Sequence, residues 1–300
     1  MFRLKIGDRM STKSAAQWLV GQNRFEKKKT STSGRKNFGS AKTISITSGK
    51  GGVGKTSISL KIAKVLAQKG YKTLVIDCDY NLSNTAVKLG LPLTDNFYSL
   101  LSAQKSFDEC LIKHDGYYLL SGCNGSIDLL NDSIGIEKFI IDILVSHENE
   151  FDYILLDSPA GIGRENLTLN AYSDHRFVVV TPDRSSLTDS YSLMKILSTK
   201  YGVSENHLIV NKISSQKQYK RIIKTLGDTV DKFLNTRLKV LGGIDRKDIS
   251  VDQFDKILFG GEDFSLHQNF INVVEMFSEE NVGTLLPISE HGQEVHLNVC

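Results

Sequence analysis

The chain has 300 residues and a mass of 33.4 kDa, and its 40% hydrophobic and 24% charged residues exclude collagen-like, mucin-like and wholly disordered proteins. Its net charge of +3 is unevenly distributed, because residues 1–42 contain 11 Lys/Arg against two acidic residues, whereas residues 257–300 contain seven acidic residues and no Lys/Arg. No apolar run approaches the roughly 18 residues of a membrane-spanning helix, and the four cysteines are widely spaced, so we expect a cytoplasmic protein without a disulfide framework or a cysteine-rich metal site.

The first 41 residues are predicted to form a basic extension outside the main domain. Residues 11–25 carry apolar side chains at helical spacing behind a Ser or Thr cap, which predicts one short amphipathic helix. Residues 27–40 are rich in Ser, Gly and Lys without apolar periodicity, which is typical of a flexible linker. We expect the compact domain to cover residues 42–280 and an acidic tail to cover residues 281–300.

Short apolar runs alternate with helical segments through the rest of the chain. Strands are predicted at residues 43–47, 73–77, 117–120, 153–157, 177–181, 208–211 and 239–241. Most of these runs are continuously apolar, and a strand that is apolar on both faces is buried on both faces, as in a parallel sheet covered by helices. Helices long enough for right-handed crossovers are predicted at residues 56–69, 134–147, 187–201, 217–234 and 265–277. The predicted fold class is therefore α/β, with one doubly wound, mainly parallel sheet flanked by helices.

A glycine-rich segment lies between the first predicted strand and the first predicted helix. It fits the phosphate-binding pattern G-x-x-x-x-G-K-[ST] and consists of Gly49, Lys50, Gly51, Gly52, Val53, Gly54, Lys55, Thr56 and the following Ser57. Glycines let backbone N–H groups approach a phosphate, and the following helix turns its positive end to the same anion. We expect Lys55 to reach the β- and γ-phosphates of a nucleotide and the Thr56 hydroxyl to ligate Mg²⁺.

The loop contains an additional lysine, Lys50, ahead of Lys55, which gives the deviant pattern K-G-G-x-G-K-[ST]. In this pattern the chain resembles the MinD/ParA family of ATPases. Three further segments at the ends of predicted strands are similar to that family's motifs, in the same order. They are Asp77-Cys78-Asp79, similar to the D-x-D of switch I, Asp157-Ser158-Pro159-Ala160-Gly161, similar to switch II, and Asn211-Lys212, where the family places its adenine contact. The resemblance covers roughly residues 42–277 and implies a deviant Walker A fold that binds ATP or ADP with Mg²⁺.

Within this family, the chain is similar to the FlhG/FleN (YlxH) group of flagellar-number regulators. Residues 157–163 resemble the group's D-x-x-A-G-I-G, and residues 181–197 resemble its segment P-T-S-[IL]-T-D-A-Y-[AS]-L-[IM]-K-x-L. Residues 233–244 are similar to its R-F-L-x-x-x-[IL]-x-x-[LV]-G-x-[IV]. Switch I departs from the group at Asn81, where glycine is usual, and at Ala86, where aspartate is usual, which puts the switch geometry and the turnover rate in question.

The resemblance also implies a role for each site residue. Asp157 holds Mg²⁺ through a water, and Asp79 lies at the metal and orients the attacking water. Lys50 reaches across an ATP-bound homodimer to the partner's phosphates, and Asp189 lies at that interface and holds Lys50 when nucleotide is absent. Together with Lys55, these residues would hydrolyse ATP to ADP and phosphate slowly, under stimulation by the dimer or by another protein.

The function implied is a switch between an ATP-bound dimer and an ADP-bound monomer that controls the number or placement of flagella. The implied partners are a flagellar SRP-type GTPase, a flagellar transcription activator or rotor switch proteins. Two alternatives stay open at this point. One is a partition-type ATPase that binds DNA nonspecifically, or another MinD-like positioning ATPase, and the other is a nucleotide-binding adaptor with little turnover.

The two ends of the chain carry further expectations. Residues 1–25, with Trp18 as an anchor, either dock on a partner or fold back onto the domain. The family's membrane-targeting helix is basic, whereas residues 265–277 are followed by acidic residues, so we expect this helix to pack against the domain. The resemblance implies a cytoplasmic protein and leaves open a peripheral position at the inner membrane or a cell pole.

Overall fold

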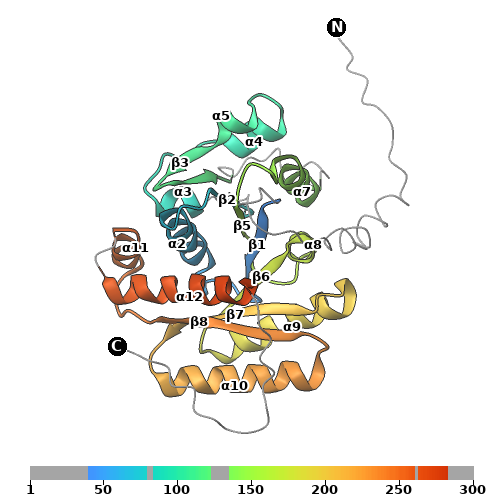
Figure 1. Cartoon of the computed structure of the whole chain (residues 1–300), viewed down its shortest axis with the longest axis vertical. Helices are drawn as coiled ribbons and strands as arrows, with labels where there is room; N and C mark the ends of the chain where they lie inside the picture. The colour runs from blue at the N-terminus through green and yellow to red at the C-terminus, as the bar shows by residue number, and fades with distance from the viewer. Residues whose placement is uncertain (1–39, 80–83, 123–134, 261–262, 283–300) are drawn as a thin grey trace.

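The computed structural model is built around one eight-stranded sheet with helices on both faces (Figure 1). The structure describes residues 40–79, 84–122, 135–260 and 263–282. The expected N-terminal helix and linker, the switch I residue Asn81 and nearly all of the expected acidic tail lie outside these described residues.

The strands follow the order β3-β4-β2-β5-β1-β6-β7-β8 across the sheet. Their bounds are β1 (Lys42–Thr47), β2 (Thr73–Asp77), β3 (Ile112–His114), β4 (Tyr117–Leu120), β5 (Tyr153–Asp157), β6 (His175–Val180), β7 (Glu205–Ile213) and β8 (Arg237–Asp245). Neighbouring strands pair in parallel, except that β3 pairs antiparallel with β4 at one edge. The doubly wound, mainly parallel sheet predicted from the apolar runs is therefore confirmed.

Ten helices are described, and each of the five helices predicted within the domain corresponds to a different one of them. The described helices are α2 (Lys55–Gln68), α3 (Asn84–Lys88), α4 (Asn96–Leu101), α5 (Phe107–Cys110), α7 (Ile136–His147), α8 (Arg164–Tyr172), α9 (Arg184–Tyr201), α10 (Gln216–Phe233), α11 (Val251–Gly260) and α12 (Phe264–Val282). The sequence analysis did not predict α3, α4, α5, α8, α11 or the edge strand β3. Four of these six elements have six residues or fewer, which is too short for an apolar period to repeat.

The helices divide between the two faces of the sheet, as the alternation within a single strand shows. In β6, Phe177 and Val179 pack in one core with residues of α2 and α12, whereas Val178 and Val180 pack in another with residues of α9 and α10. Successive side chains of a strand point to opposite faces, so a continuously apolar strand serves both cores. In Figure 1, α12 and α10 accordingly lie on opposite sides of β7 and β8.

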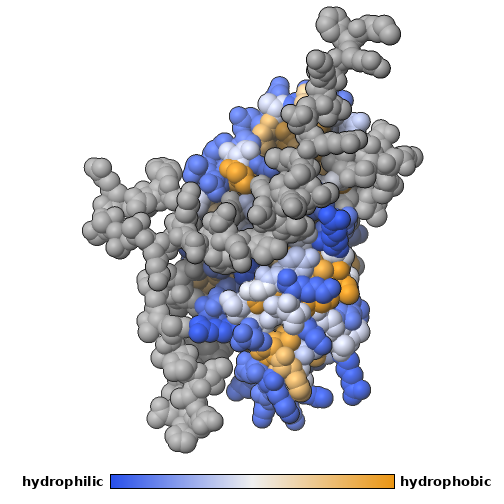
Figure 2. Space-filling model, turned by 90° about the vertical axis from the view of Figure 1, so that its right-hand side faces the viewer, coloured by the Kyte–Doolittle hydropathy of each residue, from blue (hydrophilic) through white to orange (hydrophobic). Residues whose placement is uncertain are grey.

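The last helix, α12, packs on the domain, as its acidic surroundings led us to expect. Phe270, Val273, Val274 and Phe277 are at most 2% exposed and join the core that contains α2. Among the described residues, no helix combines the length and the apolar character needed to span a membrane. On the face turned to the viewer in Figure 2, the apolar patches of the described surface are small and separated by hydrophilic residues.

Candidate functional site

The carboxyl ends of the parallel strands bring the predicted motifs to one edge of the sheet. The glycine-rich loop follows β1, and switch I begins at Asp77, the last residue of β2. Switch II begins at Asp157, the last residue of β5, and Asn211 lies near the end of β7. Strand pairing sets Asp77 and Asp157 side by side, since they are partners in the register between β2 and β5. Ligands of open α/β sheets bind at this edge, where the order of the strands reverses.

The loop between β1 and α2 has the backbone conformation of an anion cradle. Gly52 has φ of 73° and Gly54 has φ of 99°, which is a left-handed conformation that other residues adopt at a cost. Gly54 occupies the N-cap position of α2 without a side-chain cap, so the first N–H groups of the helix stay available to a ligand. The positive end of α2 and the loop amides therefore suit a phosphate group.

Gly49 is needed for packing as well as for the loop. A Cβ atom at this position would lie 2.1 Å from the carbonyl carbon of Asp189 and 2.4 Å from the backbone nitrogen of Ser190. The Gly49 backbone N–H donates to the Ser190 hydroxyl at 3.3 Å, which ties the loop to α9. The main chain of Asp189, which the sequence analysis assigned to a dimer interface, thus lies directly against the loop.

Lys55 is the partly buried cation of the site. Its Nζ donates to the Ser48 hydroxyl at 3.2 Å. Burial lowers the pKa of Lys55, while the charges of Asp157 and Asp79 oppose that shift. An ammonium group that has lost water contacts gains from a nearby anion, so the site residues fit the β- and γ-phosphates of a nucleotide.

Two carboxylates, Asp79 and Asp157, line the cavity with this lysine, and a third, Asp77, is buried beside Asp157 on the neighbouring strand. Burial raises the pKa of Asp77 to about 7, with repulsion from Asp157 as the next cause. Burial also raises the pKa of Asp157 to about 6, against hydrogen bonds from the side chains of Thr56 and Ser59, the latter at 3.0 Å. The pKa of Asp79 is raised by burial as well, and Lys55 opposes the shift.

These acids form a region of concentrated negative charge that a divalent cation would relieve. Thr56 and Asp157 are hydrogen-bonded to one another, so a hydroxyl and a carboxylate oxygen are adjacent, and Mg²⁺ prefers such hard oxygen ligands. Within the described residues, no group of three His, Cys, Asp or Glu side chains could hold a metal ion by itself. The site therefore fits a Mg²⁺ ion whose remaining ligands are phosphates and water, as is usual for nucleotide sites.

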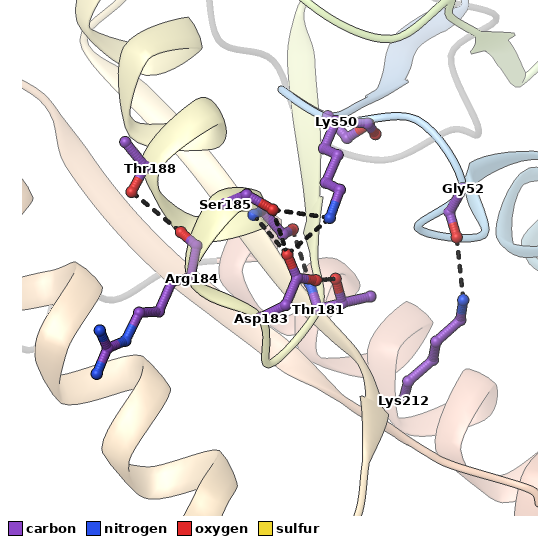
Figure 3. A network of polar contacts seen from close by, with 10 residues as sticks. Lys50, Gly52, Thr181, Asp183, Arg184, Ser185, Thr188 and Lys212 are labelled. Carbon is purple, nitrogen blue, oxygen red and sulfur yellow. Dashed lines mark hydrogen bonds and ion pairs between the residues drawn. The ribbon is translucent and has the colours of Figure 1, made fainter.

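Lys50 does not pair with Asp189, which corrects the expectation from the sequence. Its Nζ lies 2.9 Å from Asp183 Oδ1 and 2.7 Å from the Ser185 hydroxyl (Figure 3). Asp183 is the N-cap of α9, three residues after the end of β6, and its carboxylate bonds the Lys50 side chain, whereas Asp189 lies within the helix and approaches the loop through its main chain. The side chains of Lys50 and Asp183 are 41% and 45% exposed, so this ion pair lies at the surface.

Asn211 and Lys212 hold the loop from its other side. The Asn211 side-chain amide donates to the Val53 carbonyl at 2.7 Å, and its Oδ1 accepts from the backbone N–H of Lys212. Lys212 has φ of 60°, and its Nζ donates to the Gly52 carbonyl at 3.0 Å (Figure 3). The amide of Asn211, expected to contact adenine, is thus engaged by the loop while it also lines the cavity described next.

Two cavities adjoin the loop and share the residues Gly51, Gly52, Lys212 and Arg246. The larger has a volume of about 740 Å³ and is lined by Lys55, Thr56, Asp79, Asp157 and Asn211 among others. The smaller has a volume of about 450 Å³ and is lined by Lys50, Pro182, Asp183 and Gln218 among others. The large cavity contains the phosphate and metal residues, while Lys50 is directed to the small one.

The sequence analysis missed several residues that shape the site. Ser48, Ser59 and Ser190 donate or accept the hydrogen bonds that orient Lys55, Asp157 and the loop. Isolated serines carry no spacing signal, so nothing in the sequence singles them out. Asp183 could have been found, because an Asp just before a helical apolar period is an N-cap pattern, and its side chain does accept the backbone N–H of Ser186.

The fold and the site together define a P-loop nucleotide-binding protein with a second lysine in its loop. Residues 41–218 match the protein family described as an AAA domain. The chain is 34% identical over 221 residues to the flagellum site-determining protein YlxH of Helicobacter pylori, a match that covers 71% of this chain and 72% of that protein. It is 27% identical over 202 residues to the antiactivator FleN of Pseudomonas aeruginosa, with 67% and 72% covered.

A solved structure shares this fold. The septum site-determining protein MinD of Pyrococcus horikoshii, complexed with Mg-ADP, matches with a TM-score of 0.65 at 20% identity, over 80% of this chain and 97% of that chain. The chain therefore belongs to the MinD/ParA family of P-loop ATPases, as the four motifs in the sequence indicate. Members of this family bind ATP and ADP, hydrolyse ATP and dimerise.

Proposed function

We propose that this protein is an ATP-switched regulator of the number or placement of flagella. The observation that carries the proposal is the orientation of Lys50, which lies at the surface on Asp183 and leaves the phosphate site of its own chain to Lys55. A lysine placed in this way can reach the phosphates of a second copy, so hydrolysis would depend on dimerisation. The names of the relatives YlxH and FleN support the flagellar assignment.

The geometry supports the following residue roles in this proposal. Gly49 to Ser57 would hold the phosphates, with Lys55 at the β- and γ-phosphates. Asn211 would contact the adenine ring of the nucleotide. Thr56 would ligate Mg²⁺, and Asp157 would hold the ion through a water. The Mg-ADP bound to the structurally similar MinD supports the presence of Mg²⁺ in this proposal. Bound Mg²⁺ would neutralise charge that develops on the phosphates, while Asp79 orients the attacking water.

The partners would be a second copy of this chain and one flagellar protein. The candidates are an SRP-type flagellar GTPase, a flagellar transcription activator and rotor switch proteins, with the cytoplasm, a cell pole or the inner membrane surface as the location. The first test is light scattering of the purified full chain. We expect a monomer with ADP and a dimer with ATP. The same molecular mass with either nucleotide would count against the switch.

A second test addresses flagella directly. Deletion of the gene in its own organism should change the number or position of flagella seen by electron microscopy, and the Lys55→Ala variant should fail to restore them. Normal flagella in the deletion strain would refute the flagellar assignment while leaving the ATPase untouched.

One observation keeps the DNA-binding alternative in view. Lys217, Lys220, Arg221 and Lys224 recur at helical spacing on α10 and are all exposed, and such a basic face releases counterions when it binds DNA. An electrophoretic mobility shift with nonspecific duplex DNA separates the functions. ATP-dependent retardation of the DNA that weakens steeply with salt would favour the partition-type ATPase. In a separate phosphate-release assay, ATP binding without measurable release would favour the adaptor.

A further inference from the structure

Asp255 links three helices around the site, although it belongs to none of the nucleotide motifs. It lies on α11 and is only 9% exposed. Its Oδ1 accepts a hydrogen bond from the Ser57 hydroxyl at 3.2 Å, and its Oδ2 accepts one from Lys88 Nζ at 2.7 Å. Ser57 follows Thr56 in α2, and Lys88 is the last residue of α3, so one carboxylate joins the loop helix, the helix after switch I and α11.

The helix that Lys88 ends cannot be stable by itself. α3 has five residues, which form little more than one turn, and isolated helices of this length do not persist in water. It is tied at its other end by Thr85, whose hydroxyl donates to Asp77 Oδ2 at 2.7 Å. In addition to its packing on α2, α3 is therefore held by two side-chain anchors, one at β2 and one at α11.

Both anchors border the nucleotide residues. Ser57, Lys88 and Asp255 line the same cavity as Asp79 and Asp157. Asp79 ends the described part of the chain that leads into switch I, and α3 is the element in which the described chain resumes. The Asp77 carboxylate that accepts from Thr85 of α3 also accepts the backbone N–H of Asp79 at 3.1 Å, so a shift of α3 would act on Asp79 through Asp77.

The burial of the pair indicates a role in position more than in stability. The side chains of Lys88 and Asp255 are 21% and 12% exposed. A largely buried ion pair gives little net stability compared with apolar side chains of the same shape, because both charges lose water. Its directional contacts, however, fix the relative position of the two helices that carry it.

We propose that Asp255 is a positioning residue for ATP hydrolysis: through Lys88 and Ser57 it holds α3 against the loop helix and so keeps Asp79 in place at the phosphates. This inference rests on the ATPase activity of the family and is independent of the flagellar assignment. Asp255 touches no reacting atom in this scheme and acts through α3.

The variants Asp255→Asn and Lys88→Met test the clamp from both sides. Each should lower the rate of ATP hydrolysis at saturating ATP by roughly tenfold or more, since small displacements of catalytic groups have large effects on rate. The affinity for ATP in titration calorimetry should stay within about twofold, because the loop itself is unchanged. The double variant should be no slower than the slower single variant, since one interaction is removed in all three.

Asp115→Asn is the matched control. It breaks the ion pair between Lys64 Nζ and Asp115 Oδ2, which also measures 2.7 Å and also anchors α2, but on the side of β3 and β4. This variant should hydrolyse ATP at the parent rate. A parent rate in Asp255→Asn, or an equal loss of rate in Asp115→Asn, would overturn the proposal.

Hydrogen exchange gives a readout that does not depend on turnover. With Mg-ADP bound, the backbone amides of residues 84–89 should exchange faster in Asp255→Asn than in the parent, while those of residues 153–157 should not change. Uniform exchange changes across both segments would reduce Asp255 to a general structural contact and refute the positioning role. If one variant fails to fold, the other tests the same pair.

Discussion

Two lysines five positions apart in the loop have different surroundings and therefore different roles. Lys55 is partly buried, and burial lowers its pKa beside two carboxylates. Lys50 pairs at the surface with Asp183, whose pKa is lowered by hydrogen bonds from Thr181 first, and further by those from Ser185 and Lys50. The ion pair thus holds Lys50 in one position until another anion competes for it.

Lys50→Ala should bind ATP as a monomer yet fail to form a hydrolysing dimer, because the charge that acts on the partner's phosphates is removed. Asp183→Asn should dimerise at a lower ATP concentration, since it releases Lys50 while Asn still caps α9. An exposed ion pair contributes at most about 1 kcal/mol, so the gain should be no more than about fivefold. Light scattering during an ATP titration measures both effects, and a dimeric, fully active Lys50→Ala would leave Lys50 as an ordinary loop residue.

Asp79→Asn should keep ATP binding and slow hydrolysis by roughly a hundredfold, because an amide orients an attacking water less well than a carboxylate does. The ATP-bound dimer should then persist. Phosphate release measures the rate, and size-exclusion chromatography with ATP measures the dimer. If Asp79→Asn releases phosphate as fast as the parent, Asp79 has no part in hydrolysis.

Among the elements, α8 departs from what an apolar pattern leads one to expect. α8 packs on β1 through polar side chains: Ser45 Oγ donates to Asn170 Oδ1 at 2.9 Å, and Asn170 Nδ2 donates to Thr47 Oγ1 at 3.1 Å. α8 also carries Asn166, which donates to the Gly161 carbonyl of switch II at 2.5 Å. A buried polar face has no apolar period, which is why α8 escaped prediction.

In α10, the charges oppose the helix dipole. Four basic residues lie in its first nine positions, where the helix end is positive, and several of them are three or four residues apart. Lys217→Glu should raise the free energy of unfolding by about 1 kcal/mol at low salt, since it removes two like-charge pairs and places an acid in the first turn. Urea denaturation measures the change, which should shrink as salt is added.

Lys195→Glu is the control for this effect. Lys195 is exposed within α9, and Tyr191, Ser192, Ser198 and Thr199 stand three or four residues away without charge. Its replacement should change stability by less than about 0.5 kcal/mol. Equal stabilisation by both variants would show that net charge matters and the order of charges along α10 does not.

At the scale of the whole molecule, a histidine pair joins the sheet to the last helix. The rings of His175 and His207 lie 4.8 and 5.5 Å from the ring of Phe277 on α12. Burial lowers the pKa of His175 to about 4 and that of His207 to about 3, so both are neutral in the folded protein near pH 7. Protonation of either ring would place a charge beneath α12.

Because these pKa values are lower in the folded chain than the ordinary 6.5, the unfolded chain takes up protons first as the pH falls. The contribution of the two neutral histidines to the free energy of unfolding is therefore fully present above pH 6.5. Below pH 6.5 this contribution falls, by up to about 1.4 kcal/mol per pH unit for each histidine. The raised pKa values of Asp77 and Asp157 act with the opposite sign, so the informative quantity is a difference. Relative to His207→Leu, the parent should lose stability between pH 6.5 and 5 in urea titrations, and parallel curves would contradict the assignment.

The sequence alone determined seven strands of the described sheet, all but the edge strand β3, and the nucleotide loop. Continuous apolar runs such as Tyr153–Asp157 locate buried strands because burial on both faces demands apolar side chains at every position. The loop from Gly49 to Thr56 is one uninterrupted segment, so its glycines and lysine are readable without any partner. Asp77 and Asp157 could also be predicted to meet, since the ends of parallel strands share one edge of the sheet.

The tertiary structure alone decided which groups those residues touch. Lys50 pairs with Asp183, 133 residues away, and Ser57 is bonded to Asp255, 198 residues away. Such contacts depend on how each helix is rotated and docked on the sheet, and a hydrogen bond is formed or lost within about 1 Å of displacement. Spacing along the chain carries the period of a helix or strand but not its rotation against a distant neighbour, so Asp189 was expected where Asp183 lies.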